Sequence, residues 1–179
     1  MQLRKKAEYD IIFKRMNIQA RVKMTQDEYY MKEALKEAEK AYSLGEVPIG
    51  AVVVRRSTDG DKIVGRGHNM TATMKDPTLH AEMIAIREAA KTLGGWRLID
   101  CDMYVTCEPC TMCSGAILWS RIENLFMGAM DEKGGAMGSV LDVSNVEKFN
   151  HKVKVKSGIL EEECSKILKE FFKELREKK

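Results

Sequence analysis

Four residues have the types and the spacing of a metal-dependent hydrolytic centre. His80 and Glu82 lie two positions apart in the stretch LHAEMIA, and Cys110 and Cys113 lie three apart in PCTMC. Two cysteines three apart in the first turn of a helix can direct both sulfur atoms to one point. With one imidazole added, they supply three ligands of a tetrahedral zinc ion, and a site with three protein ligands keeps one position open for water. The spacing therefore predicts one zinc ion in a catalytic site.

Glu82 supplies a function that the three ligands lack. Zinc lowers the pKa of bound water from about 15.7 to about 7, but a general base must still take the proton and deliver it. A carboxylate two residues from a ligand can reach both this water and a substrate nitrogen. The arrangement predicts hydrolytic deamination, in which hydroxide attacks an amidine carbon, Glu82 transfers protons and ammonia leaves. The combination H-x-E…P-C-x-x-C is the signature of zinc deaminases that act on cytosine or adenine.

Each half of this pattern has an ordinary alternative. A lone H-x-E is common, and a lone Cys-x-x-Cys in a reduced protein can be redox-active or structural. Both halves open helices that follow strands, however, so the joint pattern favours the catalytic interpretation. Cys107 extends the motif to a three-cysteine run that could suggest an iron–sulfur cluster, but Cys101 and Cys164 are poor candidates for a fourth ligand. We expect Cys107 to be a small buried residue.

The elements that must position these residues follow from periodicity and turn residues. Short apolar runs bounded by turn signals predict strands over 48–56, 62–69, 102–107, 122–130 and 152–158, the first two joined as a hairpin through STDGD. Helical periodicity and end signals predict helices over 24–45, 78–95, 109–120 and 159–179. The first has a capping box at Thr25 and Glu28, and the second starts near Asp76 or Thr78. Strands that alternate with helices favour an α/β domain with one sheet covered on both faces.

Composition narrows the class of protein. The chain has 179 residues, 44% hydrophobic and 32% charged, and its net charge is only +3. No stretch approaches the roughly 20 apolar residues of a membrane span, and no secretory signal is expected. Five cysteines, an odd number, favour reduced thiols or metal ligands over disulfides, and hence the cytoplasm.

The charge is distributed unevenly along the chain. Residues 1–23 hold seven Lys/Arg against two Asp/Glu, a balance of +5, so the remaining 156 residues carry −2. That balance does not by itself indicate a nucleic-acid binder. We expect residues 1–23 to be a basic appendage, either flexible or preceding a native start at Met24, and residues 24–179 to form the zinc-dependent deaminase domain.

Beyond the zinc motif, four longer stretches resemble the bacterial tRNA-specific adenosine deaminases of the cytidine deaminase-like superfamily. These stretches are DPTLHAEMIAIREA, RLIDCDMYVTCEPCTMCSGAILWSRI, GAMDEKGGAMGSVLD and FNHKVKVKSGILEEECSKILKEFF. The resemblance runs from about Met24 to the C-terminal helix. It implies a three-layer α/β/α fold with a central mixed five-stranded sheet, a homodimer, and conversion of adenosine to inosine at the wobble position of a tRNA anticodon stem-loop.

The resemblance also implies roles for individual residues. It places zinc on His80, Cys110 and Cys113, with Glu82 as the proton shuttle. The implied substrate contacts are Asn69, the backbone of Ala81, Asp131 near the ribose, and the pocket residues Val47, Pro48 and Ile49. Ordinary alternatives remain, because Asn69 can cap a turn and Asp131 can be an N-cap or an Asx-turn residue. His68 is expected to be a strand-end surface residue, and His151 either faces substrate or is structural.

Two other functions stay open at this point. The chain could deaminate a free base or nucleoside such as guanine or cytosine, because the zinc chemistry is the same. It could also be a non-catalytic zinc-binding subunit that positions RNA for a partner. The presence of Glu82 argues against the second, since loss of the proton shuttle would be the simplest mark of an inactive relative.

Overall fold

The computed structural model describes residues 24–178, so the expected appendage 1–23 lies outside the described residues. Five strands are present: β1 (Gly50–Arg55), β2 (Lys62–His68), β3 (Cys101–Cys107), β4 (Asn124–Ala129) and β5 (Lys154–Lys156). The helices are α2 (Gln26–Ser43), α3 (Thr71–Met74), α4 (Ala81–Leu93), α5 (Thr111–Ser120) and α6 (Glu161–Glu177), with the 3₁₀ turn η1 (Val143–Asn145). None of these described helices is long and apolar enough to cross a membrane.

The strands form one mixed sheet in the order β2-β1-β3-β4-β5. β1 pairs antiparallel with both β2 and β3, whereas β3–β4 and β4–β5 are parallel. The predicted hairpin is the β1–β2 pair, in which His68 lies opposite Gly50. A parallel pair needs a crossover connection, and α5 provides it between β3 and β4. The mixed five-stranded sheet expected from the sequence is confirmed.

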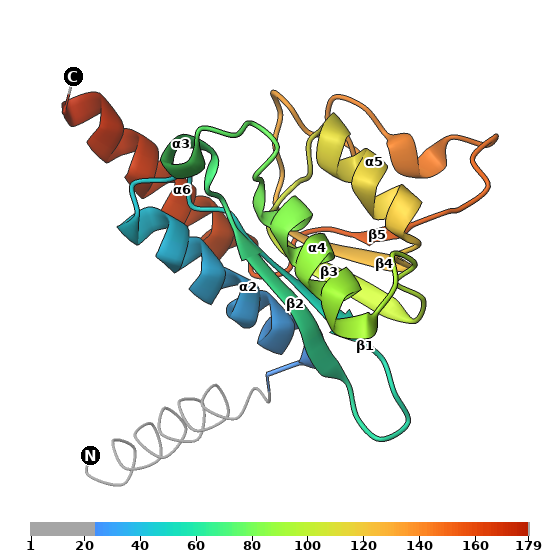
Figure 1. The fold of residues 1–179 in the computed structure, drawn as a ribbon. Coiled ribbons are helices and arrows are strands. Elements are labelled where there is room, and N and C mark those ends of the chain that lie inside the picture. Colours follow the sequence, from blue (N-terminus) through green and yellow to red (C-terminus); the bar gives the residue numbers. More distant parts are fainter. Residues whose placement is uncertain (1–23, 179) are drawn as a thin grey trace, which may run out of the picture.

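Helices cover both faces of this sheet, as Figure 1 shows. Alternating residues of β1 divide the core: Val53 packs with α4 and α5, and Val52 packs with α2 and α6. The same period of two places Met103 of β3 in the first cluster and Tyr104 in the second. The three-layer α/β/α architecture is therefore confirmed, and the beginnings of α4 and α5 lie on the same side of the sheet.

Two glycines of β2 allow α4 to lie directly against the sheet. A Cβ atom at Gly67 would overlap the carbonyl oxygen of Ala81, and a Cβ atom at Gly65 would overlap that of Ala85. Only a residue without a side chain fits at such an approach of two backbones. The close contact fixes the first turn of α4 beside the end of β2, which brings His80 next to the residues that follow that strand.

The ends of α2 agree with the signals in the sequence. The Thr25 hydroxyl accepts from the Glu28 N–H, and the Glu28 carboxylate accepts from the Thr25 N–H at 2.7 Å, so the predicted capping box is confirmed. The helix ends at Ser43, and Gly45 takes a left-handed conformation with φ 74°.

Helix α4 begins later than the sequence indicated. Its first residue is Ala81 and its N-cap is His80, three and two residues after Thr78. Asp76 accepts hydrogen bonds from the Thr78 N–H at 2.8 Å and from the Thr78 hydroxyl at 2.7 Å, which closes a turn ahead of the helix. Asp and Thr serve turns and N-caps equally well, so residue type alone could not separate the two.

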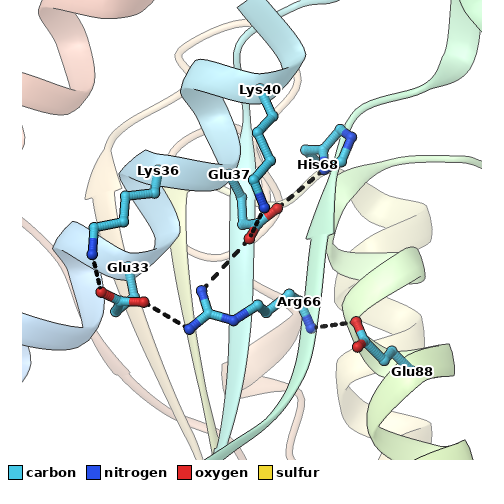
Figure 2. Close-up of polar contacts among 7 residues, drawn as sticks. All are labelled: Glu33, Lys36, Glu37, Lys40, Arg66, His68 and Glu88. Carbon is cyan, nitrogen blue, oxygen red and sulfur yellow. Dashed lines mark hydrogen bonds and ion pairs between the residues drawn. The ribbon is translucent and has the colours of Figure 1, made fainter.

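A polar network joins α2 to the end of β2, as shown in Figure 2. Arg66 donates to Glu33 at 2.6 Å and forms an ion pair with Glu37 at 3.5 Å, and its backbone N–H donates to Glu88 of α4. His68 Nδ1 lies 3.1 Å from the buried Glu37 carboxylate. His68 therefore lies at the strand end as expected, but it is half-buried against Glu37 instead of on the surface, and this network fixes the backbone just before Asn69.

Candidate active site

The three expected metal ligands come together at the beginnings of two helices. His80 is the N-cap of α4 and Cys110 is the N-cap of α5, with Cys113 in the first turn of α5. Neither N-cap side chain makes a capping hydrogen bond, although both backbones are extended there. The imidazole and the thiol are thus free to bind a ligand, and the positive ends of two helix dipoles favour a thiolate between them.

The distances between these atoms fit a zinc ion. His80 Nδ1 lies 3.7 Å from Cys110 Sγ and 3.6 Å from Cys113 Sγ, and all three ligand atoms lie within 4.8 Å of one another. Tetrahedral zinc with Zn–N of about 2.05 Å and Zn–S of about 2.3 Å requires an N···S separation of about 3.6 Å. The three residues therefore form a preorganised site for one zinc ion.

The electrostatics of the triad are those of a cation site. Hydrogen bonds with Cys113 and His80 lower the pKa of the Cys110 thiol to about 3, which favours the thiolate at this position. Hydrogen bonds with Cys110 raise the pKa of both Cys113 and His80. A divalent cation bound by the three residues would lower the pKa of both thiols.

Glu82 lies in the first turn of α4, two residues beyond His80, and is 3% exposed. Burial raises the pKa of its carboxyl above the ordinary value of 4.5. A carboxyl with a raised pKa releases and accepts a proton closer to neutral pH than an exposed one. Position and environment both suit a group that passes protons between water and substrate.

Asn69 follows β2 and is 5% exposed. Its Oδ1 accepts a hydrogen bond of 2.9 Å from the N–H of Ala81, the first residue of α4. The two expected base contacts therefore bind each other, so the Asn69 carbonyl orients the start of the helix that carries His80. The Asn69 amide nitrogen still has two N–H donors for a substrate acceptor.

Asp131 lies in the glycine-rich loop after β4, and it is an Asx-turn residue. Its Oδ1 accepts from the N–H groups of Lys133 and Gly134 at 3.0 and 3.1 Å. The turn interpretation that the sequence left open is thus confirmed for one oxygen. The same side chain lines a pocket, so a turn and a substrate contact are compatible.

The pocket beside Asp131 has a volume of about 740 Å³. Val47, Ile49 and Cys107 line it on the side of the sheet, and α6 contributes several residues opposite: Glu161, Ser165, Leu168, Lys169, Phe172 and Arg176. Pro48 is buried and does not line this pocket. His80 and Glu82 do not line it either, so the pocket includes three of the expected substrate contacts, Val47, Ile49 and Asp131, but not the zinc ligand or the expected proton shuttle.

Cys107 does not join the metal group. It is buried at the end of β3, its pKa is raised to about 12 by burial, and the group of potential ligands in the described chain contains only His80, Cys110 and Cys113. Its burial agrees with the expectation for a small buried residue. His151 Nε2 lies 2.7 Å from the carbonyl oxygen of Ile122, which favours a structural role over contact with substrate.

Sequence reasoning missed one further residue next to the triad. Glu108 immediately precedes Pro109 and Cys110, is 4% exposed, and accepts hydrogen bonds from the loop that carries Asp131. The available signal was an acidic residue at a strand end directly before a zinc ligand. Its hydrogen-bond partners lie more than 20 positions away in the chain, so the sequence around Glu108 does not indicate them.

Comparison with known proteins agrees with this geometry. The family described as the cytidine and deoxycytidylate deaminase zinc-binding region matches residues 24–129, which include all three ligands and Glu82. A tRNA-specific adenosine deaminase of Bacillus subtilis (strain 168) is 53% identical over 156 residues, which is 87% of this chain and 94% of that protein.

Two solved structures extend the comparison. The first comes from biochemical and structural studies of A-to-I editing by tRNA:A34 deaminases at the wobble position of transfer RNA. It has a TM-score of 0.73 and 44% sequence identity, and the match covers 78% of this chain and 99% of that chain. Guanine deaminase from Bacillus subtilis has a TM-score of 0.54 and 41% identity, covering 60% and 66%. The chain belongs to the tRNA-specific adenosine deaminases, within the larger family that shares the cytidine and deoxycytidylate deaminase zinc-binding region.

Proposed function

We propose that this protein is a zinc-dependent hydrolase that converts adenosine to inosine at the wobble position, position 34, of a tRNA anticodon. The observation that carries the proposal is the His80–Cys110–Cys113 triad beside buried Glu82, in a chain 53% identical to a tRNA-specific adenosine deaminase over 87% of its length. The reaction consumes adenosine and water, and it releases inosine and ammonia.

In this proposal His80 Nδ1 and the thiolates of Cys110 and Cys113 would hold the zinc ion. The ion would supply a Lewis acid beside C6 of the adenine ring. Glu82 takes a proton from the attacking water and delivers protons to the ring and to the departing amino group. Its burial excludes bulk water as a competing proton acceptor, and its raised pKa suits both directions of transfer.

The proposed contacts to the nucleoside are Asn69, Ala81, Asp131, Val47, Pro48 and Ile49. Asn69 would donate through its amide nitrogen while its carbonyl keeps the N–H of Ala81 in place. Asp131 would accept a hydrogen bond from a ribose hydroxyl through Oδ2, the oxygen that the Asx turn does not use. Val47 and Ile49 line the adjoining pocket, which supports an apolar wall for the base.

The RNA surface is proposed to follow the same pocket. Lys133, Lys169 and Arg176 line it together with Phe172, which is 41% exposed. Cations suit phosphate groups, and an exposed aromatic ring suits an unstacked base of an anticodon loop. Proteins that act on a base within RNA need that base splayed out, and a loop presents it at low cost.

The proposal extends to assembly, location and domain organisation. We place the enzyme in the cytoplasm, because its proposed substrate is tRNA and because the five cysteines, all within the described residues, form no disulfide there. A homodimer is proposed, supported by exposed apolar side chains around α5. Residues 24–179 are proposed as the deaminase domain, to which residues 1–23 are appended.

Incubation of the purified zinc-loaded protein with an arginine-tRNA anticodon stem-loop tests the proposal. We expect inosine at the wobble position, detected by mass spectrometry of nuclease digests, and no product from a matched stem-loop with adenosine placed in the stem. Affinity for the stem-loop should fall steeply with salt, because cationic contacts to phosphates release counterions. Absence of inosine from the zinc-loaded protein would refute the substrate assignment.

Guanine deamination is the second candidate, favoured by the 41% identity to guanine deaminase from Bacillus subtilis. That likeness covers only 60% of this chain, whereas the likeness to the tRNA-specific enzyme covers 87%. Free guanine, adenosine and cytidine are therefore included as parallel substrates. Release of ammonia from guanine without RNA editing would support the zinc chemistry but would show that the substrate is a free base.

A further inference from the structure

Glu108 is a buried carboxylate whose hydrogen-bond donors all come from one loop. It lies between the last residue of β3 and Pro109, and its Oε1 accepts from the N–H groups of Met137 at 2.9 Å and Ser139 at 3.0 Å. Its Oε2 accepts from the N–H of Asp131 at 3.1 Å and from the hydroxyl of Ser139. A buried carboxylate is costly unless it is hydrogen-bonded, so Glu108 and the loop depend on each other.

The loop is also attached to the backbone on either side of Glu108. The N–H of Ala136 donates to the Pro109 carbonyl at 2.9 Å, and Gly135 forms an isolated antiparallel bridge with Cys110. A Cβ atom at Gly135 would overlap the Glu108 carboxylate and the Asp131 carbonyl oxygen. The loop therefore wraps directly around the residue pair that precedes a zinc ligand, and this wrapping requires glycine at position 135.

We infer that Glu108 is a positioning residue, which holds residues 131–139 so that the Asp131 side chain faces the substrate pocket in register with the zinc site. The inference rests on the proposed function for the role of Asp131, but the anchoring itself does not. Glu108 touches the N–H of Asp131 and directly precedes Pro109-Cys110. One side chain thereby sets the separation between the ribose contact and the metal centre, and neither the zinc motif nor the loop would do so alone.

Loop anchoring is measured first, without substrate. The variant Glu108→Gln keeps the size of the side chain but turns one acceptor into a donor that faces N–H groups. An unpaired buried donor or acceptor costs about 1–3 kcal/mol, a factor of about five or more in an equilibrium, so trypsin should cleave after exposed Lys133 at least about fivefold faster than in the wild type. Zinc content should stay at one ion per chain, because the three ligands are unchanged.

Asp102→Asn is the matched control. Asp102 is also buried, lies at the other end of β3, and accepts from Asn124 and pairs with Arg56 rather than with the loop. General loss of stability would speed cleavage in both variants, whereas loss of the anchor speeds it after Lys133 in Glu108→Gln alone. Ser139→Ala, on the exposed side of the loop, should give a smaller effect in the same direction.

A double-mutant cycle then tests the link to Asp131. Asp131→Asn keeps the oxygen that accepts from Lys133 and Gly134 while it changes the substrate-facing atom. We expect Glu108→Gln to raise the KM for the stem-loop about tenfold with a smaller change in kcat, and to raise it little further in the Asp131→Asn background.

The outcomes separate the two proposals. Equal effects of Glu108→Gln in both backgrounds, or an unchanged cleavage rate after Lys133, would overturn the positioning role. A wild-type enzyme that edits no stem-loop would overturn the proposed function, while the proteolysis comparison would still decide whether Glu108 anchors the loop.

Discussion

The carboxylate of Glu82 is the single side chain on which turnover should depend most. Glu82→Gln keeps the volume of the side chain in its buried place but removes the atom that accepts a proton. We expect kcat to fall by at least about 10²–10⁴-fold, the range attributed to general acid–base catalysis. Zinc content and thermal stability should be retained, measured by metal analysis and calorimetry. Ordinary turnover in this variant would remove Glu82 from the proton-transfer role.

Cys107 provides a test of the ligand assignment among three closely spaced cysteines. Cys107→Ala removes a buried thiol that lies outside the metal group, so the protein should still bind one zinc ion per chain. Cys113→Ala is the matched comparison and should lose the ion, because it deletes a ligand. Both can be followed by metal analysis after dialysis against a weak chelator. Zinc loss in Cys107→Ala would show that the metal group is larger than the triad.

The ligands could be predicted from sequence because each half of the site is local. The spacing of the two cysteines and that of the H-x-E pair are each set within one helical turn. Only the approach of these two halves to one another depends on the fold. Contacts that cross the chain were not predictable in the same way. Asn69 binds the start of α4 and Glu108 binds a loop more than 20 residues ahead, so their partners emerge only once β2 and β3 lie in place.

At the level of elements, strands and long helices followed from the sequence, and short connections did not. Alternation and turn residues located β1 and β2, and the capping box located the start of α2. The short helix α3 was not predicted. The buried Glu46 carboxylate accepts hydrogen bonds from the N–H groups of Ala72 and Thr73 in the first turn of α3. A tertiary contact therefore stabilises α3, and the local sequence carries no signal for it.

The attachment of α2 to β2 should make stability depend on acid pH. Hydrogen bonds from Lys36 and Arg66 lower the pKa of Glu33 below 4.5. Burial acts to raise the pKa of Glu37, but hydrogen bonds from Lys40 and His68 outweigh it and lower this pKa as well. A carboxyl whose pKa is lower in the folded than in the unfolded state stabilises the fold above the unfolded pKa. That contribution is lost as pH falls through the folded pKa.

We therefore expect the free energy of unfolding to fall as pH decreases below about 4.5, and to fall less steeply in Glu33→Gln/Glu37→Gln. Urea unfolding between a pH of about 6 and about 3 measures this slope. Zinc loss at low pH affects all variants alike, so the difference between variants reports the carboxylates. Glu39→Gln, which removes one carboxylate from the exposed side of α2, should keep the wild-type slope; a wild-type slope in the double variant would contradict the assignment.

On the scale of the whole molecule, apolar side chains gather where α5 and η1 meet the solvent. Trp119 is 70% exposed, and Leu141, Val146 and Phe149 are also exposed. Trp119 and Phe149 line a second pocket of about 330 Å³ with Leu118 and Val143. An exposed apolar patch of this kind on a folded chain often marks a surface that binds another protein. Sequence alone could not reveal it, because Trp119 reads as one more apolar residue of a helix.

This patch is where the proposed homodimer can be tested. In a two-fold dimer a substitution acts twice, and loss of a central tryptophan contact costs about 2 kcal/mol or more, so Trp119→Glu should weaken association by about a thousandfold. Light scattering coupled to size exclusion should give the mass of two chains for the wild type and of one for the variant. Trp96→Glu is the matched control, since Trp96 is also exposed but lies in the loop after α4. A Trp119→Glu protein that remains a dimer would place the interface elsewhere, and a monomeric wild type would refute the homodimer itself.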